Sequence, residues 1–241
     1  SHEDLLAYLV RRLLENGANT SFVNRIQDEA LPVEEIIADP AARVRALTSI
    51  PHPRIPLPVD LFGDDRRNSS GIDLWAVEEL APLARRMAAA AEEAWEAAPL
   101  VGGRSLAGLA REVRDPSDRR RVIGQVVDTT PEQALRALER AQAAWFDWNA
   151  TPVEERAACL ERYADLLEEK RAELMTLCSR EAGKSIADGL AEVREAVDFC
   201  RYYAARARQD FGPPQSLPGP TGERNEIQLA GRGVFLCISP W

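Results

Sequence analysis

The segment SIPHPRIPLPVDLFGDDRRNSSG, residues 49–71, constrains the fold more than any other feature of this sequence. Its prolines are at positions 51, 53, 56 and 58, and its glycines are at positions 63 and 71. Because proline lacks a backbone N–H and its ring blocks a helix interior, this segment cannot be a regular helix. We therefore predict an extended connector between two compact units. Pro-x-x-Pro spacing also occurs in docking peptides, but a stiff linker is the favoured interpretation.

The stretch before the connector predicts two helices. Residues 2–15 place Leu5, Leu9 and Leu13 on one broad apolar stripe, and Gly17 follows as a stop signal. A second, shorter helix is expected over 32–47, because proline suits its first position and two acids in its first turn suit the helix dipole.

The stretch after the connector predicts alternating helices and strands. We expect Thr151 to cap one of these helices, with Glu154 at capping-box spacing and Gly183 at the helix end. A breaker is expected over 212–222, and two short strands joined by residues 231–233 are expected between 225 and 241. Helices are predicted over 74–98, 131–148, 152–182 and 184–210, and a strand over 120–130.

Composition excludes several classes of protein. The net charge of −9 argues against a general nucleic-acid surface. No apolar run reaches the roughly 18–20 residues that cross a bilayer, and the first residues do not read as a signal peptide. The four cysteines and two histidines do not have zinc spacing, so reduced, mostly buried thiols of a cytosolic protein are expected.

Two motifs invite a functional interpretation that the sequence does not support. AGKS at 182–185 resembles part of a phosphate loop, but that loop needs glycine where Cys178 stands, and the preceding stretch predicts helix instead of strand. Lys184 and Glu181 are interpreted as part of a helix end. Trp145 and Trp148 lie three residues apart on one helix, which favours a core position over a ligand box.

The first helix carries a more specific constellation. Tyr8, Arg11, Arg12 and Glu15 fall at i, i+3, i+4 and i+7, so they share one side of the helix. Two guanidinium groups there could bind a carboxylate through charge-assisted hydrogen bonds. A solvated charged face is the alternative, because arginine pairs also occur at 66–67, 85–86 and 119–121.

The last residues, GVFLCISPW, predict a strand that runs into a turn fixed by Pro240. Such a turn presents main-chain groups at the end of a sheet, where open α/β folds bind ligands. The pattern is weak by itself, because many strands end in proline.

Four stretches resemble one family in the same order along the whole chain. They are YLVRRLLENGANTSFVNRI, PRIPLPVDLFGDDRRNSSGIDL, EEAWEAAPLVGG and GRGVFLCISPW, and they are similar to bifunctional proline utilization A. In that family an FAD-dependent proline dehydrogenase (β/α)8 barrel precedes an NAD-dependent aldehyde dehydrogenase module of α/β, Rossmann-like fold. The resemblance implies the end of the barrel over 1–30, a connector over 31–73 and the N-terminal part of the aldehyde dehydrogenase over 74–241.

The resemblance also implies roles for single residues. Arg11 and Arg12 match the residues that bind the carboxylate of L-proline, and Tyr8 matches a tyrosine that lines that site. Glu15 matches an acid that supports this carboxylate-binding arginine pair beside FAD. Phe22 matches a position near the adenosine of FAD, although a packed core phenylalanine fits equally. Ile238, Ser239, Pro240 and Trp241 match the turn that contacts NAD. The nucleophilic cysteine is expected beyond Trp241, and Cys237 is not assigned that role.

The function implied is oxidation of L-proline to pyrroline-5-carboxylate, followed by NAD-dependent oxidation of glutamate semialdehyde. A quinone is the expected electron acceptor, and a homo-oligomer in the cytoplasm, peripheral to the inner membrane, is expected. Two alternatives stay open: a stand-alone NAD-dependent aldehyde dehydrogenase with an unrelated helical extension, and a non-enzymatic helical interaction module.

Overall fold

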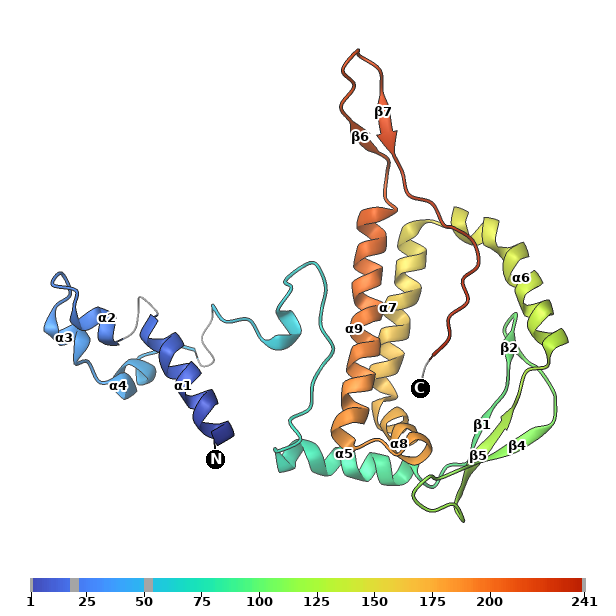
Figure 1. Cartoon of the computed structure of the whole chain (residues 1–241), viewed down its shortest axis with the longest axis horizontal. Coiled ribbons are helices and arrows are strands. Elements are labelled where there is room, and N and C mark those ends of the chain that lie inside the picture. The colour runs from blue at the N-terminus through green and yellow to red at the C-terminus, as the bar shows by residue number, and fades with distance from the viewer. Residues whose placement is uncertain (1, 18–21, 50–53, 240–241) are drawn as a thin grey trace. The chain divides into compact units, whose positions relative to one another are not determined.

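The computed structural model describes residues 2–17, 22–49 and 54–239. The chain divides into two compact units, residues 1–55 and residues 56–241 (Figure 1).

The described residues of unit 1 form the helices α1 (His2–Gly17), α2 (Phe22–Ile26), α3 (Val33–Ile36) and α4 (Pro40–Arg45). The prediction of α1 is confirmed. The prediction of one helix over 32–47 is wrong, because Pro40 cannot continue a helix and starts a new one. Asp39 caps that new helix, since its Oδ1 accepts a hydrogen bond from the N–H of Ala41 at 2.9 Å.

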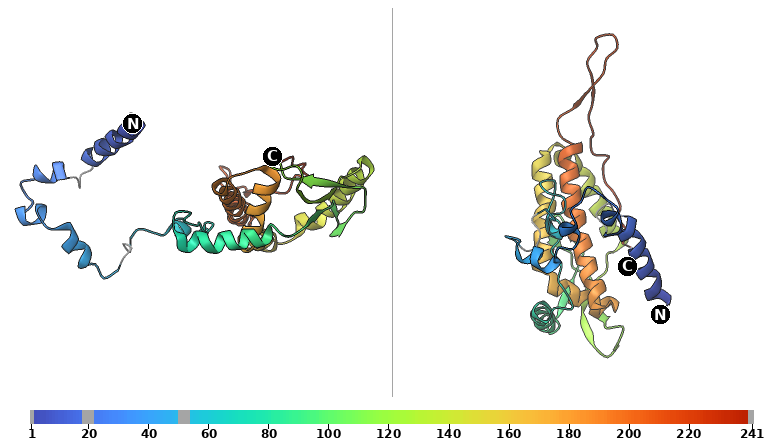
Figure 2. Two further views of the ribbon diagram at one scale, coloured as in Figure 1. Left: turned by 90° about the horizontal axis from the view of Figure 1, so that it is seen from below. Right: turned by 90° about the vertical axis from the view of Figure 1, so that its left-hand side faces the viewer.

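Unit 2 is built on four packed helices that follow a short 3-10 turn, η1 (Pro58–Asp60). They are α5 (Val77–Ala90), α7 (Val153–Glu169), α8 (Arg171–Ala182) and α9 (Ile186–Asp210). Helices α7 and α9 run side by side (Figures 1 and 2). Their shared core is apolar and contains Leu83, Ala164, Met175, Leu190, Val193 and Val197.

The helix ends in unit 2 differ from two predictions. Thr151 does not cap α7; its hydroxyl donates to the carbonyl of Asp147 at 2.9 Å and closes the end of α6 (Pro131–Ala150). The capping box lies at the start of α6 instead, where Thr130 and Gln133 bond each other reciprocally. The predicted helix over 152–182 divides at Lys170 into α7 and α8, and Gly183 ends α8 at φ 67°, as predicted.

A three-stranded sheet lies beside these helices, in the order β1-β5-β4. Strand β1 (Trp95–Ala97) runs parallel to β5 (Val122–Val127), and β4 (Ala110–Arg114) runs antiparallel to it. The strand predicted over 120–130 is confirmed as β5. The helix predicted over 74–98 is wrong at its end, because α5 stops at Ala90 and residues 95–97 pair with β5. Gly124 allows that pairing, since a Cβ there would lie 2.0 Å from the carbonyl oxygen of Trp95.

Two hairpins complete unit 2. Strands β2 (Leu100–Val101) and β3 (Arg104–Ser105) form the first, which turns at glycines 102 and 103. Strands β6 (Gln215–Leu217) and β7 (Asn225–Ile227) form the second, which projects from the helices (Figure 1). The breaker expected over 212–222 therefore contains a strand.

The final described segment, 228–239, forms no strand with any described part of the chain. Of the two strands predicted between 225 and 241, only β7 is confirmed. Phe235 is 70% exposed and Leu236 is 85% exposed, so the apolar pattern of this segment is not buried here. A strand needs a hydrogen-bonding neighbour, and no described segment lies against this one as a strand.

The four cysteines are free, and their burial differs from the prediction. Cys159 and Cys237 are exposed, whereas Cys178 and Cys200 are half-buried. Cys237 thus lies in an exposed, irregular segment and not in a buried strand. Burial raises the pKa of the Cys178 and Cys200 thiols, so their nucleophilic thiolate forms are disfavoured.

Asp115 joins the sheet to α8. This buried carboxylate accepts hydrogen bonds from the N–H and hydroxyl of Ser117 at 2.8 and 2.5 Å, and from Arg121 at 3.0 Å. Arg180 of α8 approaches the same carboxylate at 3.4 Å. The Ser117 hydrogen bonds hold the pKa of Asp115 below its ordinary value. The charged carboxylate is therefore the form that the fold stabilises.

We predict that Asp115→Asn lowers the melting temperature at neutral pH by several degrees and removes an acid-sensitive contribution to stability. Because the folded-state pKa lies below the unfolded value of about 3.9, that contribution is complete above about pH 5 and fades as pH falls through the folded pKa. Thermal unfolding from pH 7 to pH 3 measures the difference between wild type and variant, which should shrink below about pH 4. Asp118→Asn is the comparison, because the hydrogen bond from Arg120 also lowers the pKa of Asp118 but Arg120 is exposed, so this variant should change stability less. An unchanging difference down to pH 3 would contradict the assignment.

Candidate substrate and cofactor sites

The first candidate site is the charged side of α1. Tyr8, Arg11 and Arg12 are all exposed, and the Cζ of Arg12 lies 5.5 Å from the centre of the Tyr8 ring. A guanidinium over an aromatic face is held by cation–π attraction. Arg11 forms no hydrogen bond or ion pair with the residues that the structure describes. Its guanidinium can therefore bind an anion without first breaking an internal contact.

The apolar side of α1 does not fix the direction of these arginines. Leu9 is 47% exposed, and Leu13 and Leu14 are each 72% exposed. A helix of 16 residues is marginally stable without packing. The leucine stripe thus gives α1 its helical pattern, but its described leucines form no buried core that would orient Arg11 and Arg12.

Two further predicted residues are described only by their backbone. Glu15 lies in the last turn of α1 and Phe22 begins α2, and the side chains of both are outside the described part of the chain. Their predicted positions beside FAD stay predictions.

The second candidate site lies at the end of the described chain. Ser239 borders a cavity of about 930 Å³ over helices α8 and α9, with an apolar floor that includes Leu177 and Val193. Ile238 is 80% exposed, and Pro240 and Trp241 lie outside the described residues. The structure therefore brings one of the four predicted NAD-turn residues to a cavity.

The charged side chains that line this cavity are mostly acidic. Three carboxylates, from Glu181, Glu192 and Glu195, face one ammonium group, Lys184. The Nζ of Lys184 lies 2.5 Å from Glu192, which raises the pKa of this lysine and keeps it charged and paired. A pyrophosphate would meet net negative charge here, so these side chains do not fit the phosphates of NAD.

Asn149 is a residue of this region that sequence reasoning missed. Its Oδ1 accepts a hydrogen bond from the N–H of Gly231 at 2.7 Å, which ties the segment leading to Ser239 onto the end of α6. A Cβ at position 231 would lie 2.7 Å from the same oxygen. The sequence shows a glycine at 231, which indicates a close backbone contact, but it does not show that the partner is Asn149, 82 residues earlier.

No helix in the described ranges combines the length and apolarity needed to cross a membrane. Among the same residues, no three His, Cys, Asp or Glu side chains gather as metal ligands.

Comparison with known protein families assigns the two ends of the chain. Residues 1–25 match the model of proline dehydrogenase, and residues 106–241 match that of the aldehyde dehydrogenase family. The second match covers more than half of the chain. The chain belongs to the aldehyde dehydrogenase family. The matched residues 106–241 make up most of unit 2, which is called the aldehyde dehydrogenase unit for that reason, and the α/β class predicted from the sequence is confirmed.

Two PutA relatives align with all or nearly all of this chain, and a third relative aligns with about half of it. The bifunctional protein PutA of Escherichia coli K12 is 44% identical and aligns with 100% of this chain and 18% of its own length. A crystal structure of proline utilization A from Bradyrhizobium japonicum is 43% identical with a TM-score of 0.69, and the match covers 96% of this chain and 20% of that one. The 1-pyrroline-5-carboxylate dehydrogenase 2 of Bacillus subtilis is 34% identical over 53% of this chain and 24% of that protein.

The predicted resemblance to proline utilization A is thus confirmed along this chain. The chain spans about a fifth of the length of the PutA proteins that it matches.

We predict that Gly231→Ala destabilises the aldehyde dehydrogenase unit by about 1–3 kcal/mol, because the new methyl group overlaps the Asn149 oxygen. Asn149→Ala removes that oxygen, so the double variant should lose less than the sum of the two single losses. Urea unfolding of the four proteins measures the coupling. Strict additivity would show that the two residues do not meet in solution.

Proposed function

We propose that this chain is part of a two-step oxidoreductase that converts L-proline to L-glutamate. One observation carries the proposal: Tyr8, Arg11 and Arg12 share an exposed side of α1, within the stretch that matches proline dehydrogenase. The PutA relatives, whose printed name is bifunctional, support the second step because they align over the aldehyde dehydrogenase unit as well.

In the first step, Arg11 and Arg12 bind the carboxylate of L-proline. Two adjacent guanidinium groups supply several charge-assisted donors, which fix both the position and the rotation of a small zwitterion. Tyr8 forms a flat wall beside them. This orientation directs the carbon next to the ring nitrogen toward the acceptor. FAD, with Glu15 and Phe22 nearby, would supply hydride acceptance, and a quinone would reoxidise it.

In the second step, hydrolysis of pyrroline-5-carboxylate gives glutamate semialdehyde, which is oxidised with NAD as hydride acceptor. The turn formed by Ile238, Ser239, Pro240 and Trp241 is proposed to contact NAD through main-chain groups. The acidic cavity beside Ser239 supports a location for the phosphates elsewhere. The nucleophilic cysteine is proposed to lie beyond Trp241. The raised pKa of the Cys178 and Cys200 thiols disfavours that role for these two residues.

The proposed organisation follows from the same resemblance. Residues 1–30 would end the proline dehydrogenase barrel, 31–73 would connect the modules and 74–241 would begin the aldehyde dehydrogenase. We propose a homo-oligomer in the cytoplasm that associates peripherally with the inner membrane when it reduces quinone.

We predict that Arg11→Ala or Arg12→Ala in the full-length protein raises the KM for proline strongly. Loss of a charge-assisted contact to a carboxylate costs about 1.5–3 kcal/mol, which corresponds to roughly 10- to 150-fold. Steady-state kinetics with proline and, separately, with glutamate semialdehyde measure both steps. Aldehyde oxidation should stay at the wild-type rate. Arg85→Ala, in the exposed pair on α5, is the matched control. Wild-type proline kinetics in both variants would rule out carboxylate binding by Arg11 and Arg12.

The two alternatives make different predictions. A stand-alone aldehyde dehydrogenase would purify without the absorbance of a bound flavin, and a helical interaction module would capture a partner through residues 51–58 alone. The match of residues 1–25 to proline dehydrogenase favours the two-step enzyme over both.

A further inference from the structure

The end of the connector is held to the aldehyde dehydrogenase unit by two carboxylates. Asp198 of α9 accepts the N–H of Ser69 at 2.6 Å on one oxygen and the Ser69 hydroxyl at 2.9 Å on the other. Glu168 of α7 accepts both the N–H and the hydroxyl of Ser70, at 2.6 and 2.8 Å. Each acid thus recognises two donors of one serine, which fixes the backbone as well as the side chain.

Three arginines surround these two acids. Arg201 donates to the carbonyl of Asn68 at 3.0 Å and to Glu168 at 2.9 Å. Arg171 donates to the carbonyl of Ser70 at 2.9 Å, and Arg194 donates to the Ser69 hydroxyl at 3.3 Å. Burial opposes ionisation of Glu168, but the hydrogen bonds from Ser70 and Arg201 outweigh it, so its pKa lies below the ordinary value. The acid is therefore charged at neutral pH.

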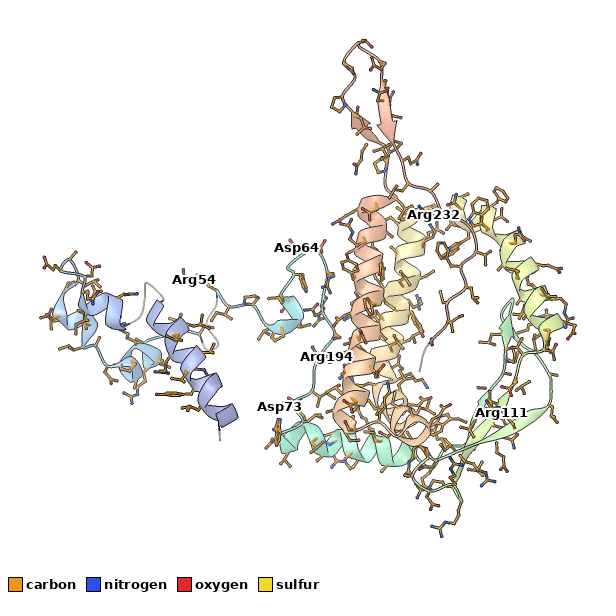
Figure 3. The ribbon with its side chains drawn as sticks, viewed as in Figure 1. Arg54, Asp64, Asp73, Arg111, Arg194 and Arg232 are labelled. Carbon is orange, nitrogen blue, oxygen red and sulfur yellow. The ribbon has the colours of Figure 1, made fainter. Side chains whose placement is uncertain are left out.

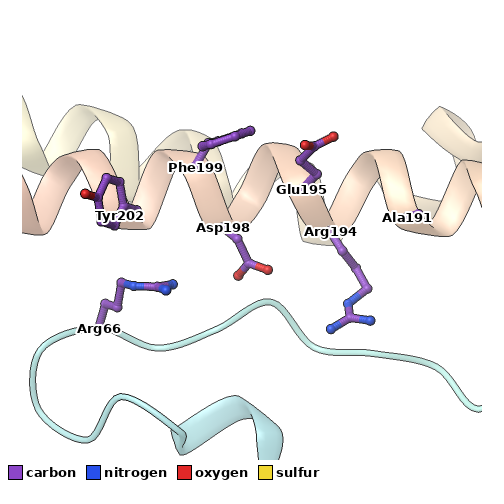
Figure 4. Close-up of a pocket in the computed structure, with 7 residues that line it drawn as sticks. All are labelled: Arg66, Ala191, Arg194, Glu195, Asp198, Phe199 and Tyr202. Carbon is purple, nitrogen blue, oxygen red and sulfur yellow. The ribbon is translucent and has the colours of Figure 1, made fainter.

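The residues before the serines are held as well. Arg66 lies over the ring of Phe62, with its Cζ 3.8 Å from the ring centre, and 5.7 Å from that of Tyr202 on α9. Asn68 closes the loop by donating to the carbonyls of Pro58 and Val59, at 2.8 and 2.9 Å. In Figure 4, Arg66 and Asp198 both lie between the connector and α9, and Arg194 reaches toward the connector from the same side (Figures 3 and 4).

This degree of recognition exceeds what a linker requires. Connecting segments normally run over the surface with solvated backbone groups. Here Ser69 is only 3% exposed, and its partner lies 129 residues later in the chain. Ser69 buries its two donors against the charged Asp198, and this contact is specific to the backbone conformation because an unpaired buried donor would be costly. Ser70 is exposed, and its two donors add a second pairing with Glu168 at the surface.

We propose that Asp198 and Glu168 form a lock that fixes residues 66–71 onto helices α7 and α9, so that the connector is held on this unit well before the start of α5. The two acids are positioning residues for the connector. This role rests on the two-step enzyme proposed above. In that enzyme the lock sets how much of the connector between the two catalytic modules can move.

Limited proteolysis of the full-length protein tests the lock. Trypsin can cut after Arg66 or Arg67 inside the locked segment and after the exposed Arg54 outside it. The measured ratio is the cleavage rate at Arg66 or Arg67 divided by the rate at Arg54, which serves as an internal reference. Asp198→Asn sets an amide donor against one of the two Ser69 donors, and Glu168→Gln does the same toward Ser70 or Arg201. Each variant should raise this ratio about tenfold, because the loss of one charge-assisted hydrogen bond makes local opening of the segment more frequent by about that factor.

Asp165→Asn is the matched control. Asp165 also pairs with Arg201, at 2.9 Å, but contacts no part of the connector, so its ratio should change less than about twofold. Ser69→Ala should raise the ratio by itself and add little to Asp198→Asn, because both remove the same contact. Rates of proline and aldehyde oxidation should stay near wild type in every variant.

Three outcomes would overturn the lock. They are an unchanged ratio in both acid variants, an equal rise in Asp165→Asn, and cleavage spread through α7 and α9, which would make the acids folding determinants only. Failure of the proposed function would look different, because a protein that does not oxidise proline would still show the same cleavage pattern.

Discussion

The packing of α7 against α9 is the contact on which the rest of unit 2 depends. It is close because alanines lie at the interface: Ala157 and Ala164 of α7 and Ala204 of α9 are completely buried. Small side chains let the helix axes approach, and the apolar cluster around Met175 then fills the space toward α8. The burial of apolar area drives this contact, and its geometry is fixed before any polar group is considered.

The polar contacts of the same helices depend on that geometry. Arg208 of α9 binds Glu161 of α7 through two bonds, at 2.6 and 2.8 Å, and Arg201 binds Glu168 two helical turns away. Exposed ion pairs contribute little to stability, so these arginines do not hold the helices together by themselves. They hold carboxylates at defined positions along the interface between α7 and α9. Asp198 and Glu168 can recognise the connector serines only because the alanine interface sets the distance between their helices.

The sequence predicted the elements whose signals are local. Proline at 131 and glycine at 183 mark helix boundaries that the structure confirms, because their effects depend on backbone chemistry at one position. Residues 95–97 were missed because the alanine-rich stretch before them favours helix, and pairing with β5 overrides that preference. Thr151 had the right spacing for a cap, but its hydroxyl reached a carbonyl of the preceding helix.

The candidate sites divide in the same way. The shared side of Tyr8, Arg11 and Arg12 follows from helical periodicity, so the sequence alone could place these three together. Its orientation could not be predicted, because the leucines opposite find no core within unit 1. The connector lock could not be predicted at all, since Ser70 and Glu168 are 98 residues apart and serines in a polar stretch are typical of loops.

Opposite charges separate the two candidate sites chemically. The α1 side offers cationic donors that suit the carboxylate of a zwitterion, whereas the cavity beside Ser239 has an excess of carboxylates. At short range and reduced dielectric, that excess repels any anion, including the carboxylates of proline and of its oxidation products. The lining charges of the cavity over α8 and α9 therefore disfavour the class of ligand that the cationic side of α1 suits.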